Sequence, residues 1–106
     1  MDDVFHALAH GARRDMLGRL ADTELTVGEL AEPLEMSLAA ASKHIQVLER
    51  AGLVGRTVDG RRHVCRLEPA PLATAAEWLG SYERYWTGRL DALERLFGSN
   101  PDQEDR

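Results

Sequence analysis

The residues with the clearest chemical potential are small and polar side chains between positions 37 and 46. Small side chains let a helix backbone approach the edges of DNA bases, and longer amide or ammonium groups reach bases or phosphates. Gln46 could read adenine through two hydrogen bonds. The candidate recognition residues are Ser37, Ala39, Ala40, Ser42, Lys43 and Gln46. The alternative interpretation of this segment is an ordinary Ala-rich helix with one solvated face.

A second group of cations surrounds the dipeptide Asp59-Gly60. That dipeptide is preferred in a two-residue type I′ turn, so the segments 53–58 and 61–67 are predicted to pair as a hairpin. Arginines near the tip of a hairpin suit phosphate contact or entry into the minor groove. We call this hairpin the wing, and its candidate contact residues are Arg56, Arg61 and Arg62. The alternative is a solvated hairpin whose arginines serve solubility.

Helices must position these side chains, and their ends are visible in the sequence. Thr26 and Glu29 form a predicted capping box for a helix over 27–32, which Pro33 ends. Ser37 caps a further helix that extends to about residue 51, and Gly52 follows as its C-cap. Its predicted core face comprises Leu38, Ala41, Ile45 and Leu48.

Further helices are predicted on both sides of this region. Two short ones lie at the start of the chain, the first with an apolar face that includes Phe5 and Leu8, the second over 13–20. A long one is predicted over 72–97, with its apolar stripe uninterrupted. We expect a mainly α fold with a β-hairpin, a winged helix-turn-helix with a long last helix. Residues 1–98 would form one domain, and 99–106 a disordered acidic tail.

The apolar helix surface exceeds what a chain of 106 residues buries easily alone, so a homodimer is predicted. The predicted dimer interface comprises Phe5, Leu8, Leu79, Tyr82, Trp86, Leu90, Leu93 and Phe97. A ligand pocket among the aromatic side chains of the last helix is the alternative, with Trp78, Tyr82, Tyr85 and Trp86 as its lining.

Charge is unevenly distributed along the chain. The net charge is −5, but residues 37–66 contain six basic and two acidic side chains, a local net charge of +4. A basic segment between acidic flanks is typical of a DNA-facing surface on an acidic body. The sequence lacks an apolar run of the length that crosses a membrane and a signal-peptide pattern, so we expect a cytoplasmic location without membrane contact.

Metal-binding and catalytic patterns are weak. Cys65 is the single cysteine, and His6 and His10 are the one histidine pair at helical spacing. Cys65 is interpreted as a core residue, with oxidant sensing as the alternative. Because no nucleophile–base motif or phosphate loop is present, we expect no enzyme, and we expect no metal or cofactor.

The first two-thirds of the chain resemble the ArsR family of winged-helix repressors (ArsR/SmtB-type). The resemblance depends on the Arg13-Arg14 helix start, the segment ELTVGELA, the pattern S-x-x-x-x-S-K-H-I, the segment LERAGLV and the Asp59-Gly60 hairpin. It implies a homodimer, paired through its first and last helices, that binds near-palindromic operators. Metal-sensing relatives have two cysteines where this chain has Thr26 and Gly28, so the resemblance implies the branch without metal sites.

Together these observations predict a homodimeric, metal-independent repressor whose partners are double-stranded DNA and a second copy of the chain. Two alternatives stay open. One is a winged-helix protein-interaction module without DNA binding. The other is a repressor gated by an organic ligand or by oxidation of Cys65, with the effector unknown.

Overall fold

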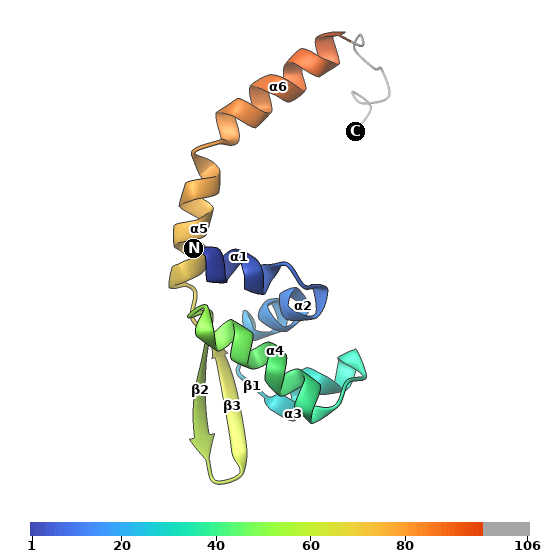
Figure 1. The fold of residues 1–106 in the computed structure, drawn as a ribbon, viewed down its shortest axis with the longest axis vertical. Coiled ribbons are helices and arrows are strands. Elements are labelled where there is room, and N and C mark those ends of the chain that lie inside the picture. Colours follow the sequence, from blue (N-terminus) through green and yellow to red (C-terminus); the bar gives the residue numbers. More distant parts are fainter. Residues whose placement is uncertain (97–106) are drawn as a thin grey trace. The chain divides into compact units, whose positions relative to one another are not determined.

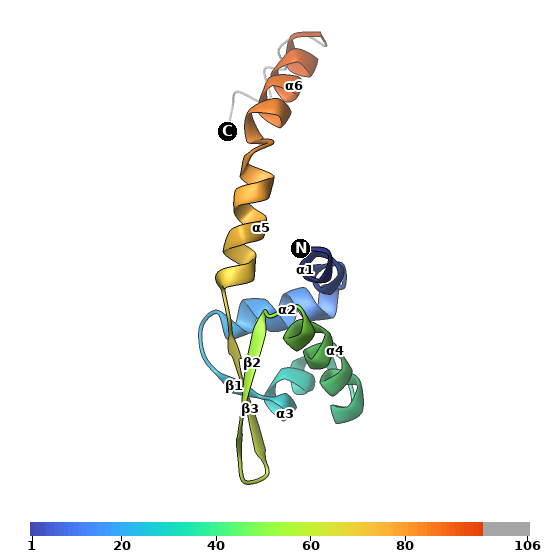
Figure 2. The same ribbon diagram turned by 60° about the vertical axis from the view of Figure 1, so that its left-hand side comes forward.

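The computed structural model describes the backbone of residues 1–96, and within the last helix the side chains of residues 84–86, 90 and 93 are not described. The chain divides into two compact units, residues 1–75 and residues from 76 onward. Each unit is described by itself. Figures 1 and 2 show the helices and the hairpin of the first unit.

The order of elements matches a winged helix-turn-helix, mainly helical with one small antiparallel sheet. The elements are α1 (Asp2–Leu8), α2 (Gly11–Leu20), β1 (Leu25–Thr26), α3 (Val27–Ala31), the 3₁₀ helix η1 (Glu32–Leu34), α4 (Leu38–Arg50), β2 (Val54–Asp59), β3 (Arg62–Leu67), α5 (Ala70–Gly80) and α6 (Glu83–Leu96).

The helix-turn-helix is built from α3 and α4, and side-chain caps fix where each helix starts. The Thr26 hydroxyl accepts a hydrogen bond from the Glu29 N–H at 3.1 Å, and the Glu29 carboxylate accepts one from the Thr26 N–H at 2.8 Å. The Ser37 hydroxyl accepts from the Ala40 N–H at 3.1 Å. Both predicted caps are therefore confirmed. The α3 helix ends one residue earlier than predicted, and Pro33 lies in η1.

The end of α4 is a Schellman motif. The Leu53 N–H donates to the Leu48 carbonyl and the Gly52 N–H donates to the Glu49 carbonyl, both at 2.9 Å. Gly52 has φ of +77°, a left-handed conformation that glycine adopts without steric cost. Leu48 and Leu53 are both fully buried, so the motif turns the chain from the recognition helix into the sheet within the core.

The sheet has three strands in the order β1-β3-β2, all antiparallel. The prediction included the hairpin but not β1, which pairs Leu25 with Cys65. The predicted turn is also wrong by one residue. Asp59 lies opposite Arg62, so the loop is Gly60-Arg61, and Gly60 has φ of +62°. Glycine at the first loop position, with no positive φ at Arg61, is the pattern of a type II′ turn. Arg61 therefore lies at the hairpin tip.

The core of the first unit is formed by one face of each helix and the inner ends of the strands. Its fully buried large side chains are Met16, Leu30, Ile45, Leu48, Leu53 and Cys65. The core face predicted for α4 is confirmed at Ala41, Ile45 and Leu48 but is wrong at Leu38, whose side chain is 61% exposed. Side chains in a helix tilt toward its N-terminus, so a residue in the first turn projects beyond the helix end.

The predicted single helix over 72–97 is two helices, α5 and α6, separated at Ser81–Tyr82. The Ser81 hydroxyl donates to the Trp78 carbonyl at 2.6 Å, and the Tyr82 N–H donates to the Leu79 carbonyl three residues back. Gly80 lowers helix stability at the same place, and serine side chains compete for backbone groups. An uninterrupted apolar stripe did not reveal this break. The predicted tail at 99–106 lies outside the described residues.

Candidate nucleic-acid interface

The outward face of α4 carries the predicted recognition residues. Ala39, Lys43 and Gln46 are exposed, Ala40 and Ser42 are half-buried, and Ser37 is the exposed N-cap. In the part of the chain that the structure describes, the side chains of Ser42, Lys43 and Gln46 form no hydrogen bond or ion pair. Their polar groups are therefore available to a ligand.

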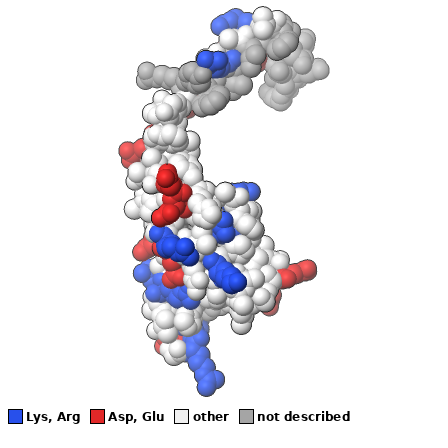
Figure 3. All heavy atoms as spheres, in the orientation of Figure 1, with Lys and Arg blue, Asp and Glu red and all other residues white. Residues whose placement is uncertain are grey.

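The hairpin exposes Arg61 at its tip and Arg62 at the start of β3 to solvent. Figure 3 shows Lys and Arg side chains gathered over α4 and the hairpin on one face of the first unit. The carboxylate of Glu29 is influenced by the positive charge of Arg62 on the wing. Hydrogen bonds from Thr26 hold the pKa of Glu29 below its ordinary value, and the positive charges of Arg62 and Arg19 lower that pKa further. The wing is thus cationic at its tip and partly neutralised near α3.

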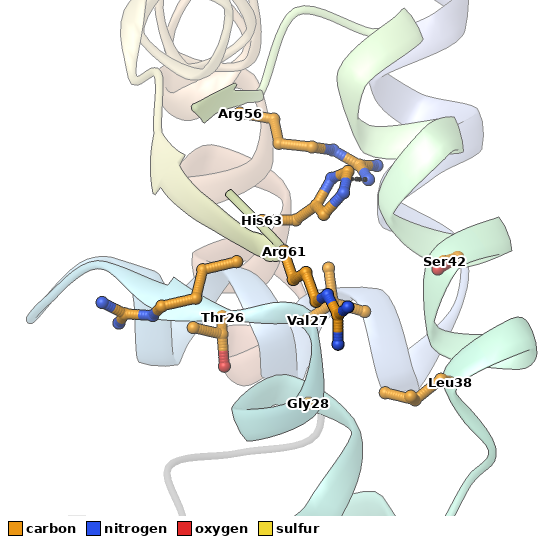
Figure 4. A pocket seen from close by; sticks show the side chains of 9 residues that line it. Thr26, Val27, Gly28, Leu38, Ser42, Arg56, Arg61 and His63 are labelled. Carbon is orange, nitrogen blue, oxygen red and sulfur yellow. Dashed lines mark hydrogen bonds between the residues drawn. The ribbon is translucent and has the colours of Figure 1, made fainter. Parts of the chain in front are cut away.

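An open hollow of about 510 Å³ separates the wing from the helix-turn-helix. Residues from α3, α4 and the hairpin line it, and Figure 4 shows Arg61 pointing into this space. Its lining residues are Thr26, Val27, Gly28, Leu38, Ser42, Arg56, Arg61, Arg62 and His63. The structure therefore brings one predicted recognition residue, Ser42, to the same hollow as the three predicted wing residues.

Arg56, which lines this hollow, has protein partners. Its guanidinium donates to both carboxylate oxygens of Glu49 on α4, at 3.2 and 2.6 Å, and lies 3.3 Å from His63 Nδ1. A two-point contact between guanidinium and carboxylate is geometrically specific. The Arg56–Glu49 bridge therefore ties β2 to α4, which fixes the wing against the recognition helix.

Arg66 is also engaged within the sheet. Its guanidinium donates to the Thr57 hydroxyl at 2.9 Å and lies 3.8 Å from the Glu68 carboxylate. Its cross-strand partner is Gly55, where a Cβ atom would lie 2.6 Å from the guanidinium. The absence of a side chain at Gly55 lets Arg66 lie across the neighbouring strand, so this cation contributes to sheet packing.

Arg13 forms an unpredicted polar centre behind the recognition helix. Its side chain is buried, with 8% of the residue exposed. It donates to the Ala7 carbonyl at 2.7 Å, to the His6 carbonyl at 3.2 Å and to His44 Nδ1 at 3.1 Å. Arg13 therefore connects the end of α1 to α4. The sequence shows only two adjacent arginines, and nothing in it distinguishes the buried one from its exposed neighbour.

The imidazole of His44 makes stability depend on pH. Burial lowers its pKa from the ordinary value of 6.5, and the nearby His10 ring, 4.5 Å between centroids, and Arg13 lower it further. A lowered pKa means that the unfolded chain binds the proton more tightly. The contribution of His44 to stability is therefore complete above pH 6.5 and is lost as the pH falls through 6.5 toward the lowered pKa.

We expect the His44→Gln variant to show a flatter decline in melting temperature between pH 7.5 and 5 than the original chain, by about one to a few degrees. Thermal unfolding followed by circular dichroism measures it. His6→Gln is the matched control, since the His6 side chain is exposed, and it should retain the original slope. Identical slopes in the original chain and the His44→Gln variant would contradict this assignment.

Cys65 and the histidines bear on metal and redox chemistry. Cys65 is fully buried on β3, and burial raises the pKa of its thiol. A buried thiol with a raised pKa reacts slowly. Among the described residues, no cluster of His, Cys, Asp and Glu side chains is arranged to hold a metal ion.

Within the same residues, no helix combines the length and apolarity needed to cross a lipid bilayer.

The predicted dimer residues fall into three groups. Phe5 and Leu8 are half-buried and pack against the core of the first unit. Leu79 and Tyr82 are 53% and 44% exposed. The Tyr82 ring meets Trp78 edge-on, with 5.2 Å between centroids. The other predicted contacts, Trp86, Leu90, Leu93 and Phe97, lie outside the described side chains.

Known proteins are similar to this chain in sequence and in architecture. A family model described as a helix-turn-helix domain matches residues 8–56. The HTH-type transcriptional regulator Rv2034 of Mycobacterium tuberculosis is 41% identical over 101 residues, 95% of this chain and 92% of that protein.

Two solved structures extend the comparison. The crystal structure of the ArsR family transcriptional regulator RHA00566 has a TM-score of 0.75 and 37% identity, covering 81% of this chain and 89% of that one. The solution structure of Mb0332 from Mycobacterium bovis is described as a homodimeric winged helix-turn-helix DNA-binding domain. Its TM-score is 0.62 with 31% identity, over 76% of this chain and 78% of that one. The chain belongs to the ArsR family of helix-turn-helix transcriptional regulators.

Proposed function

We propose that the chain is a homodimeric, cytoplasmic repressor that binds a near-palindromic DNA operator without a metal effector. The observation that carries this proposal is the hollow that Leu38 and Ser42, from the first turns of α4, share with arginines from the hairpin. A helix with small outer residues fits the major groove, and cations beside it fit the adjacent phosphates.

A dimer would extend this surface to two half-sites. Two recognition helices about 34–36 Å apart read successive major grooves on one face of the duplex, and two-fold symmetry makes the operator near-palindromic. The exposed side chains of Leu79 and Tyr82 support pairing through the last helices, as does the solved homodimeric relative. Repression follows when the occupied operator overlaps a promoter, because the dimer then excludes the polymerase.

The two parts of the surface should separate by mutation. We assign base selection to the helix, with Gln46 and Ser42 among its readers, and phosphate attraction to Arg61 and Arg62, with Arg56 holding the wing in place. The Arg62→Ala variant should weaken binding to operator and to random DNA alike, and lower the salt slope by about one to two units per dimer. The Gln46→Ala variant should weaken operator binding selectively, by about 1–3 kcal/mol.

Fluorescence anisotropy of both variants measures these effects, using a duplex selected by the purified protein from a random library and its scrambled counterpart across a salt series. An unchanged slope in Arg62→Ala would remove the wing from the interface. Failure of the original chain to bind any duplex at low salt would refute the DNA-binding proposal and favour the protein-interaction module.

Metal should have no effect on this binding. Thr26 and Gly28 provide no thiolates at the positions used by metal-sensing relatives, and the thiol of Cys65 is buried. We expect equal affinities for the selected duplex with a strong chelator and with added zinc, measured by the same anisotropy assay. A reproducible difference of about tenfold, without precipitation of the protein, would reveal a metal site.

A further inference from the structure

Leu38 has an environment that is unusual for a leucine. It is the first residue of α4, directly after the Ser37 cap, and it is 61% exposed, whereas Ala41, Ile45 and Leu48 on the same helix are fully buried. Single exposed apolar residues are common on protein surfaces, so exposure alone indicates nothing. The position of Leu38 provides the second observation.

The Leu38 side chain lies at the edge of the hollow between the helix-turn-helix and the wing (Figure 4). A Cβ atom at Gly28 would be 3.8 Å from Leu38 Cδ2, so the isobutyl group lies against a bare stretch of α3 backbone. Ser42, one helical turn further along α4, lines the same hollow, and so does Arg61. Leu38 is thus an apolar group in a polar, cationic setting.

Base chemistry determines what such a group can recognise. The N-terminal residues of a recognition helix are those that contact base edges. In the major groove, base edges present hydrogen-bond donors and acceptors, and thymine alone adds an apolar group, its 5-methyl. The neighbours of Leu38 on α4 are the cap Ser37 and the small, exposed Ala39, which let the helix end approach the duplex closely.

We propose that Leu38 packs against the 5-methyl group of one thymine in each half-site, so that this residue selects a T·A pair at that position. The proposal rests on the proposed function, DNA binding through α4. It adds a contact of specified chemistry to the polar ones assigned to Gln46 and Ser42. Binding would remove both the exposed isobutyl group and the thymine methyl group from water, which is favourable in free energy. A base edge with only polar groups offers no such apolar surface to bury.

The test removes the methyl group alone. Deoxyuridine keeps every hydrogen-bonding group of thymidine, so each thymine of the library-selected duplex is replaced by uracil, one symmetric pair at a time. We expect one pair of positions at which the original chain binds about fourfold more weakly per half-site, or about fifteenfold in the doubly substituted duplex. The Leu38→Ala variant should bind the thymine and uracil duplexes equally.

Two variants serve as controls. Leu38→Met keeps an apolar side chain of similar reach and should retain the preference for thymine. Val58→Ala removes an apolar side chain that is similarly exposed on the hairpin, outside the hollow, and should behave as the original chain. Circular dichroism verifies that Leu38→Ala is folded, as expected for an exposed position.

The outcomes separate the two proposals. If the original chain selects no duplex, the proposed function fails. If it selects a duplex and uracil has no effect at any position, or if Leu38→Ala retains the full sensitivity to uracil, then DNA binding stands and the contact between Leu38 and thymine is refuted.

Discussion

Replacing Arg13 with methionine is expected to lower the free energy of unfolding by about 2–4 kcal/mol. The substitution removes hydrogen bonds from a buried guanidinium to two carbonyl oxygens and one imidazole nitrogen, and it removes the donor that the buried Ala7 carbonyl has in Arg13. Methionine retains most of the apolar stem, so the loss reports the polar contacts. Urea unfolding at a fixed protein concentration measures the difference, because the stability of a dimer depends on concentration.

Arg14→Met is the matched control for this experiment. Arg14 is the adjacent arginine, is exposed, and donates one hydrogen bond to the Leu8 carbonyl at 2.8 Å. Its replacement should cost less than about 1 kcal/mol. Equal losses of unfolding free energy for the two variants would show that burial of the Arg13 contacts adds nothing to stability. The hydrogen bonds by which Arg13 connects α1 to α4 would then not stabilise the fold.

The second large effect is expected for Leu79→Glu. In the proposed dimer, this half-exposed side chain becomes buried between two copies, where unpaired carboxylates are strongly unfavourable. The variant should therefore be monomeric. A monomer engages one half-site at a time, so affinity for the selected duplex should fall by about a hundredfold or more.

Light scattering measures the mass of each species, and the mass of a monomer is 11.8 kDa. The matched control is Thr74→Glu, which introduces the same carboxylate at an exposed position on another side of α5 and should leave the dimer intact. A monomeric mass for the original chain at micromolar concentration would overturn the prediction of a homodimer, and with it the assigned role of Leu79.

The features predicted correctly from sequence are those that neighbouring residues determine. Thr26 and Ser37 cap helices through hydrogen bonds to residues three positions later, and Gly52 ends α4 through its own backbone conformation. A pattern within a few residues contains all the information that such features need. The winged helix-turn-helix follows, because the order of these local elements already limits how they pack.

Several features that were wrong or missed depend on more than the neighbouring residues, although the break between α5 and α6 is local and an apolar stripe does not reveal it. Periodicity predicts Leu38 in the core, but Leu38 is the first residue of α4, and its side chain projects past the N-terminal end of the helix. The turn at Gly60 is displaced by one residue because cross-strand pairing, not the dipeptide alone, sets the register. The burial of Arg13 depends on carbonyl groups at the end of α1 and on His44 of α4.

The Arg56–Glu49 bridge has a consequence for how readily specificity can be altered. Glu49 lies near the C-terminal end of α4, whereas Ala39, Lys43 and Gln46 lie closer to its start, and their side chains have no polar contacts with the rest of the described chain. Substitutions at Ala39, Lys43 and Gln46 would leave the bridge in place. The outer surface of α4 is therefore transplantable: a different set of reading residues could be grafted there while the wing keeps its position.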